Sequence, residues 1–123
     1  KIATLQMVYD ELNRVKEKIY PNKLTGTPDP AVKEEFTYYK NGLVLTHKDR
    51  KNNKTTYAYD GNNRTKEITL PPFQGTEKKI VYTYDDAGNL VIETDPAGFK
   101  TIYLRDEMHR VTEVKTGKEE TNL

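Results

Sequence analysis

Residues 82–98 read YTYDDAGNLVIETDPAG, and this stretch decides the fold. Its two tyrosines lie two positions apart, which places both rings on one face of a β-strand. The segment at 85–89 has turn chemistry, because Asp can hydrogen-bond the backbone ahead of it and Gly and Asn tolerate positive φ. Apolar residues resume at 90–92, and the Thr-Asp-Pro-Ala-Gly at 94–98 marks a second break. The stretch therefore predicts a strand, a tight turn and a strand, which together form a β-hairpin.

The same pattern recurs along the chain. Related four-residue phrases occupy 7–10, 36–39, 57–60, 82–85 and 103–106, with steps of 29, 21, 25 and 21 residues. When residues 36–68 are laid over residues 82–114 without a gap, ten of the 33 positions are identical. A recurrence of this length indicates a supersecondary unit stacked on copies of itself. We therefore predict an all-β fold of tandem β-hairpin repeats that form an extended, twisted antiparallel sheet ribbon.

The chain is interpreted as a single repeat segment, residues 1–123, excised from a larger protein. It contains about five hairpin units at approximately 7–35, 36–56, 57–81, 82–102 and 103–123. Residues 2–19 admit two interpretations, because their apolar residues recur every three or four positions, as on an amphipathic helix. The repeat register favours a hairpin there, with a turn at 10–13 and a second strand from Arg14 to Tyr20.

Composition narrows the class of protein. Leu, Ile, Val and Phe account for only 26 of the 123 residues, whereas there are nine tyrosines, so the core should be thin and aromatic. The net charge is +1 with both signs interspersed, which argues against nucleic-acid binding. Cysteine is absent, so disulfides and thiolate metal sites are excluded. No apolar run has the length of a transmembrane helix, and we predict no membrane insertion.

The pattern Tyr-x-Tyr-Asp-x-x-Gly-Asn/Arg-Leu, followed by Thr-Asp-Pro-x-Gly, resembles the YD repeat of Rhs proteins, teneurins, bacterial wall-associated proteins and toxin-complex C subunits. In that family the repeats build a β-sheet ribbon that spirals into a hollow shell around a C-terminal toxin, or belong to an adhesive ectodomain. The resemblance implies a structural role in a secreted or cell-surface bacterial protein. It also implies three kinds of partner: neighbouring repeats of the same parent chain, an encapsulated toxin domain, or a cell-surface glycan. Three positions depart from the family pattern: Tyr39 replaces the Asp, Leu43 the Arg, and Arg105 the second Tyr.

The repeat-signature residues are assigned a structural role. They are Tyr9, Asp10, Arg14, Tyr38, Gly42, Tyr57, Tyr59, Asp60, Arg64, Tyr82, Tyr84, Asp85, Gly88, Asp95, Gly98, Tyr103, Asp106 and Arg110. An Asp and an Arg four positions apart could form a ladder of polar ligand sites. Their repetition favours instead a charge-assisted hydrogen bond that fixes each turn and packs one hairpin against the next.

The four tyrosines Tyr57, Tyr59, Tyr82 and Tyr84 could form a ligand face that stacks on sugar rings, although a period-2 aromatic pair is more often the packed face of a sheet. His47 and His109 occupy different places in the repeat, so we predict no metal site. Serine and cysteine are absent, which leaves little for nucleophilic catalysis. We predict no catalytic residue, no cofactor and no enzymatic activity.

Overall fold

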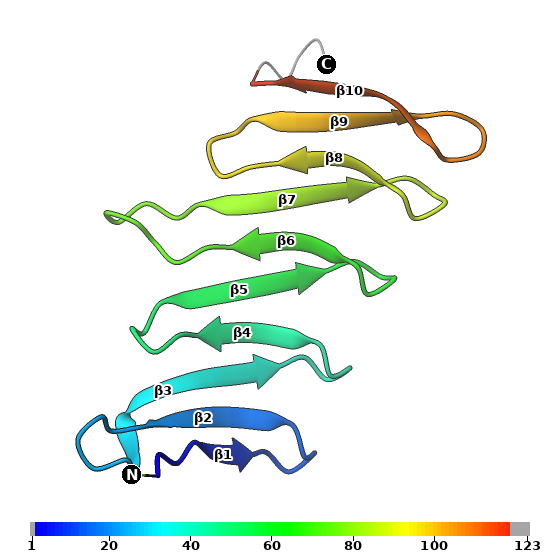
Figure 1. Cartoon of the computed structure of the whole chain (residues 1–123). Helices are drawn as coiled ribbons and strands as arrows, with labels where there is room; N and C mark the ends of the chain where they lie inside the picture. The colour runs from blue at the N-terminus through cyan, green and yellow to red at the C-terminus, as the bar shows by residue number, and fades with distance from the viewer. Residues whose placement is uncertain (1, 119–123) are drawn as a thin grey trace. The chain divides into compact units, whose positions relative to one another are not determined.

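The computed structural model describes residues 2–118, which form ten β-strands and no helix. The chain divides into two compact units, the first ending at Thr56 and the second beginning at Tyr57. In each unit consecutive strands run antiparallel and are joined by short connections (Figure 1). The predicted all-β fold of tandem antiparallel hairpins is confirmed.

The first unit contains β1 (Gln6–Tyr9), β2 (Val15–Pro21), β3 (Pro28–Tyr38), β4 (Val44–Lys48) and the beginning of β5 (Lys54–Tyr59). Each strand pairs with the next one along the chain. The second unit contains the end of β5 and then β6 (Thr65–Thr69), β7 (Lys79–Tyr84), β8 (Leu90–Thr94), β9 (Lys100–Arg105) and β10 (Val111–Gly117). From β6 onward, each strand again pairs with its successor.

Residues 6–21 form a hairpin, residues 2–5 form neither strand nor helix, and the helical alternative for residues 2–19 is wrong. Their strands, β1 and β2, pair antiparallel, and Tyr9 lies opposite Val15. The apolar positions that imitate a helical period are explained by a β-bulge between Val8 and Tyr9, which shifts the register by one residue just before the turn. Bulges at the same place precede or follow three other turns, between Thr37 and Tyr38, Thr83 and Tyr84, and Val111 and Glu113.

The core is as thin as the composition predicts. Ile19, at 8% exposure, is the one buried hydrophobic residue in the described part of the chain, and no large side chain there is fully buried. Most strand residues are half-buried instead. Because apolar burial is the main driving force of folding, a sheet with so little of it must depend on hydrogen bonds and on contacts between neighbouring hairpins.

The connection between β2 and β3 is closed by a glycine. The Gly26 N–H donates to the carbonyl of Asn22, and Gly26 in turn accepts a hydrogen bond from the N–H of Thr4. A Cβ at Gly26 would lie 2.4 Å from the carbonyl oxygen of Ile2, and its φ is +76°, so only glycine fits this position. Residues 22–33 are a polar insert that lengthens the first repeat, and their second half lies in a strand, because β3 begins at Pro28.

Candidate functional site

The repeated structural site is a five-residue turn that begins with aspartate, here named the Asp turn and numbered i to i+4. In the turn at 60–64, Oδ1 of Asp60 accepts the N–H of Asn62 at 2.8 Å and that of Arg64 at 3.0 Å. The Asp60 N–H donates to the Arg64 carbonyl, and the Asn63 N–H to the Asp60 carbonyl. Asn63, at i+3, has a φ of 64°. This combination is a type I turn followed by a left-handed residue, a common three-residue hairpin loop.

Six Asp turns occur within residues 2–118. They begin at Asp10, Asp49, Asp60, Asp85, Asp95 and Asp106. A seventh turn begins at Tyr39, where Oδ1 of Asn41 accepts the Leu43 N–H in place of the missing carboxylate. Asp49 and Asp95 lie between hairpins rather than at their tips. The same turn therefore shapes both ends of the strands, and the signature list from the sequence omitted Asp49 although Asn52 stands at its i+3.

Five of the six Asp turns favour the ionised form of their carboxylate. The lowered pKa values are those of Asp10, Asp49, Asp60, Asp85 and Asp106. The main cause is that each carboxylate accepts a hydrogen bond from the backbone N–H of residue i+4, and partial burial offsets this effect only in part. Where residue i+4 is arginine, its Nε also donates to Oδ2, at 2.7 Å in Arg64 and 2.8 Å in Arg14. These carboxylates are therefore poor candidates for general acids or bases near neutral pH.

Each of these two arginines also contacts the next hairpin, in an arrangement named here the Arg–Tyr contact. The guanidinium carbon of Arg14 lies 4.5 Å from the ring centroid of Tyr38, and the Tyr38 hydroxyl donates to the Val15 carbonyl at 2.6 Å. In the second unit, Arg64 lies 4.5 Å from the ring of Tyr84. The Tyr84 hydroxyl donates to the Thr65 carbonyl at 2.7 Å. A cation–π interaction and a tyrosine hydrogen bond thus join hairpins that are about twenty residues apart in sequence, and Nη1 of Arg14 also donates to the Tyr39 carbonyl at 3.3 Å.

A third contact uses different residues in the same places. Asn89 stands at i+4 of the Asp turn that begins at Asp85. Arg105 stands immediately before the Asp turn that begins at Asp106. Nη2 of Arg105 donates to the Leu90 carbonyl at 3.0 Å, and Leu90 takes the place of Val15 and Thr65. Nη1 of Arg105 donates to the His109 carbonyl, also at 3.0 Å. Arg105 therefore replaces the tyrosine hydroxyl as donor to the neighbouring hairpin.

The remaining signature residues lie in strands and turns of the repeat. Tyr57, Tyr82 and Tyr103 are half-buried strand residues, and burial raises the pKa of Tyr82. Gly42, Gly88 and Gly98 occupy the left-handed i+3 position of their turns, with φ of 92–93°. The ligand-face role of Tyr57, Tyr59, Tyr82 and Tyr84 stays a prediction.

A polar network that the sequence does not reveal crosses β2, β3 and β4. The Tyr20 hydroxyl donates to Oε1 of Glu34, and Nε2 of His47 lies 2.7 Å from Oε2 of the same carboxylate. The His47 ring stacks on Phe36 with a centroid distance of 4.8 Å. The hydrogen bond from Tyr20 lowers the pKa of Glu34, and the same bond raises the pKa of Tyr20. The charged Glu34 carboxylate on β3 therefore links β2 to β4 through its contacts with Tyr20 and His47.

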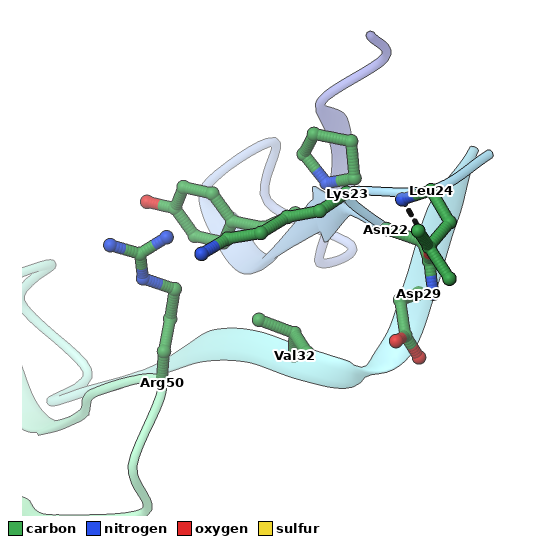
Figure 2. A pocket seen from close by; sticks show the side chains of 8 residues that line it. Asn22, Lys23, Leu24, Asp29, Val32 and Arg50 are labelled. Carbon is green, nitrogen blue, oxygen red and sulfur yellow. Dashed lines mark hydrogen bonds between the residues drawn. The ribbon is translucent and has the colours of Figure 1, made fainter. Parts of the chain in front are cut away.

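An open pocket of about 540 Å³ lies beside this network (Figure 2). Its lining combines the apolar Val32 and Leu24 with the charged Lys23, Asp29 and Arg50. The guanidinium carbon of Arg50 lies 4.3 Å from the ring centroid of Tyr20, which also lines the pocket. The pocket could not be predicted from the sequence, because most of its lining residues lie in the insert at 22–33, which has no counterpart in the other repeats.

Residues 2–118 carry no feature of a metal site or of a membrane-spanning helix. No group of three or more His, Asp or Glu side chains there is placed to hold a metal ion. The described part of the chain contains no helix with the length and hydropathy that crossing a membrane requires.

Comparisons with known proteins agree with this architecture. The RHS Repeat family model matches residues 84–121. Among solved structures, TcdB2-TccC3-TEV is similar at 20% identity and a TM-score of 0.73, over 91% of this chain. TcdB2-TccC3-Cdc42 is similar at 21% identity and a TM-score of 0.69, over 88%. A Photorhabdus luminescens Tc holotoxin pore with mutated TccC3 has 22% identity and a TM-score of 0.68, over 86%. This chain spans only 6% of each of those chains, and no curated protein matches it.

The fold and the repeated site define a class, an all-β protein of tandem hairpins that are capped by Asp turns and joined by side-chain contacts across neighbouring hairpins. Within that class, the predicted resemblance to the YD-repeat family is confirmed by the match of the RHS Repeat model to residues 84–121.

Proposed function

We propose that this chain is a structural segment of a large secreted bacterial toxin protein, in which its hairpins form part of a wall that encloses a toxin or effector. The observation that carries the proposal is the fold that it shares with Tc toxin chains, over 86–91% of its residues with TM-scores of 0.68–0.73. The chain is then one short portion of a much longer series of repeats.

The side-chain geometry supports a mechanical role. Each Asp turn fixes the path of the backbone at the end of a hairpin, and each Arg–Tyr contact joins that turn to the following hairpin. A wall built this way needs little buried apolar surface, because each unit is held by polar contacts to its neighbours. This agrees with the single buried hydrophobic residue among residues 2–118.

We also propose that the segment itself supplies no catalytic group. A general acid or base for neutral pH needs a pKa close to 7, whereas the carboxylates of five Asp turns and of Glu34 have pKa values shifted downward. Their hydrogen-bonding capacity is used by backbone amides and by side chains of adjacent strands. They are suited to holding the sheet together.

The proposal is tested on the native protein of the source organism. An antibody raised against this chain should detect, in the secreted fraction, a protein far heavier than 14.2 kDa. Limited proteolysis of that protein should leave a protected fragment beyond the repeats, which becomes sensitive once denaturant opens the wall. A band near the mass of this chain alone, or a C-terminal portion cleaved as fast before denaturation as after it, would contradict the proposal.

A further inference from the structure

The pocket beside Tyr20 differs from the rest of the repeat, because it joins apolar walls to cations that lack a carboxylate partner. All of its lining residues lie between positions 20 and 50, inside the first unit. Its volume of about 540 Å³ is large enough for a small organic ligand. The insert that supplies most of its walls has no counterpart in the other repeats. The repeat architecture alone therefore does not require this pocket.

Two cations reach the pocket from different connections. Lys23 lies in the connection between β2 and β3, and Arg50 lies in the turn between β4 and β5. Within residues 2–118, neither of them forms an ion pair. Figure 2 shows the Lys23 side chain extending toward Arg50 and away from the Asp29 carboxylate. One end of the pocket therefore carries two positive charges that no carboxylate in the described part of the chain contacts.

Arg50 is positioned in a way that leaves its donors available. Its guanidinium carbon lies 4.3 Å from the ring centroid of Tyr20, and the Tyr20 hydroxyl is itself held by Glu34. A guanidinium that stacks on a ring keeps N–H groups at its edge, in the fork geometry that matches a carboxylate. No side-chain N–H of Arg50 donates to another residue among 2–118. The stacking therefore orders a carboxylate-binding group before any ligand arrives.

The carboxylates near these cations do not cancel their charge. Asp29 lines the pocket, and Asp49 lines an adjoining hollow of about 680 Å³ that shares Lys23 and Arg50 with it. Both carboxylates accept hydrogen bonds from backbone N–H groups one to four residues ahead of them. The adjoining hollow also adds a third cation, Lys51. Three cations thus stand against two carboxylates across the two hollows, and the balance favours an anionic ligand.

The rest of the pocket selects for an apolar body on that anion. Pro21, Val32 and the Tyr20 ring line it. Leu24 lines it too, and this side chain is 80% exposed to solvent. A ligand that covers these side chains gains the free energy of burying apolar surface, which an inorganic ion cannot do.

We propose that this pocket binds a small organic acid, in which a carboxylate is joined to an apolar group. Lys23 and Arg50 hold the carboxylate by charge-assisted hydrogen bonds, and the apolar group lies against Tyr20, Leu24 and Val32. This chemistry occurs in a free organic acid and at the C-terminus of a peptide that ends in an apolar residue. The site belongs to residues 20–50 and is independent of the proposed toxin wall.

The test is a titration of the whole chain with N-acetyl-phenylalanine, followed by the NMR shifts of its backbone amides. This acid should shift the amides of Lys23, Leu24, Val32 and Arg50, with a Kd on the order of 1 mM. N-acetyl-phenylalaninamide has the same ring without the carboxylate, and it should bind at least about tenfold more weakly. Inorganic phosphate has charge without an apolar body, and it should also bind at least about tenfold more weakly.

A peptide that ends in phenylalanine distinguishes the two sources of the ligand. If it binds as tightly as N-acetyl-phenylalanine, the site accepts the end of a polypeptide chain. If the peptide is excluded while N-acetyl-phenylalanine binds, the site is one for a free organic acid.

Substitution of the two cations makes the test specific. Lys23→Gln and Arg50→Gln should each weaken binding of the acid about tenfold, because each removes one charge from the carboxylate site. Both residues are exposed, so circular dichroism should show unchanged strand content. Lys40→Gln is the matched control, since Lys40 is an exposed lysine in the turn between β3 and β4, at the other end of these strands. This control should leave the Kd unchanged.

Three results would overturn the proposal. One is the absence of shifts at these amides up to about 10 mM acid. Another is equal binding of the amide or of phosphate, which would reveal an apolar surface or an adventitious ion only. The third is binding by Lys23→Gln and Arg50→Gln that is as tight as binding by Lys40→Gln. Binding that requires the carboxylate, exceeds that of phosphate and is weakened in both pocket variants alone would establish the site.

Discussion

The contacts at Arg14–Tyr38 and Arg64–Tyr84 differ from the third contact, between Arg105 and the Leu90 carbonyl, in which hairpin supplies the cation. In the first two, the earlier hairpin supplies the guanidinium and the later one supplies the ring. In the third, the earlier hairpin supplies a neutral Asn and the later one the guanidinium. In all three contacts, the later hairpin donates a hydrogen bond to the backbone carbonyl of the residue that follows the earlier Asp turn. These carbonyls belong to Val15, Thr65 and Leu90. Each contact therefore contains a guanidinium group and a hydrogen bond to this backbone carbonyl, although different residues provide them.

The largest expected effect comes from removing a ring that has its partner. We expect Tyr84→Ala to lower the free energy of unfolding by about 2–4 kcal/mol, because a part-buried ring, its contact with Arg64 and its hydrogen bond are lost together. Tyr9→Ala removes an exposed ring at the same repeat position, where no arginine among residues 2–118 stacks on it, and it should cost under about 1 kcal/mol. Urea denaturation measures the free energy of unfolding of both variants. Equal losses would show that the Arg–Tyr contact adds nothing to stability.

Acid should weaken at once the five Asp turns at Asp10, Asp49, Asp60, Asp85 and Asp106. Their carboxyl pKa values are lowered below the ordinary 3.8 by backbone N–H groups in the folded state, so the unfolded chain binds protons more readily. This stabilisation is fully present above the unfolded pKa and is lost as pH falls through the folded values. The urea midpoint should therefore hold steady above about pH 5 and fall progressively below it.

A single variant can separate this effect from other acid effects. Asp60→Asn retains a side-chain oxygen that can accept the backbone N–H groups, but it cannot titrate. It should lower the urea midpoint at neutral pH and flatten the decline below pH 5 relative to the wild type. An unchanged pH profile would mean that the charge of Asp60 has no part in the turn.

Much of this fold was open to prediction from the sequence, because the signals are local. The tyrosine spacing, the Asp-x-x-Gly/Asn turns and the repeat register predict the hairpins, and register correctly outweighed the helical period of residues 2–19. The bulges beside four of the turns explain why periodicity alone misleads there, since one extra residue shifts the alternation of a strand.

The contacts between hairpins were harder to foresee because their partners are distant in sequence. Arg105 could be interpreted from sequence only as a departure from the pattern, whereas in space it donates to the Leu90 carbonyl next to Asn89. A signal did exist, since Asn89 and Arg105 depart from the arginine and tyrosine places of one and the same contact. The Glu34 network and the pocket beside Tyr20 gave no signal, because they depend on the register between β2, β3 and β4.

A smaller effect should come from mixing the two kinds of contact. Asn89→Arg alone places a second guanidinium beside Arg105, and repulsion between them should cost about 1 kcal/mol. Arg105→Tyr alone leaves a ring with no cation beneath it and should cost a similar amount. The double variant recreates the Arg–Tyr pairing and should recover to within about 0.5 kcal/mol of wild type. The double-mutant cycle, measured by urea denaturation, would show no coupling if the exchange of residues were accidental.

The smallest effect should come from the tyrosine hydroxyl alone. Tyr84→Phe keeps the ring over Arg64 and removes only the donor to the Thr65 carbonyl, so it should cost about 1 kcal/mol, the usual net contribution of one hydrogen bond. Tyr38→Phe removes the equivalent bond to Val15 and should cost the same. If Tyr84→Phe cost as much as Tyr84→Ala, the hydrogen bond would dominate the contact. Arg105, which takes the tyrosine position and supplies the same hydrogen bond without a ring, would then stabilise its contact as much as a tyrosine does. A loss near 1 kcal/mol instead assigns most of the stability to the stacked ring, and makes the Asn89–Arg105 contact the weakest of the three.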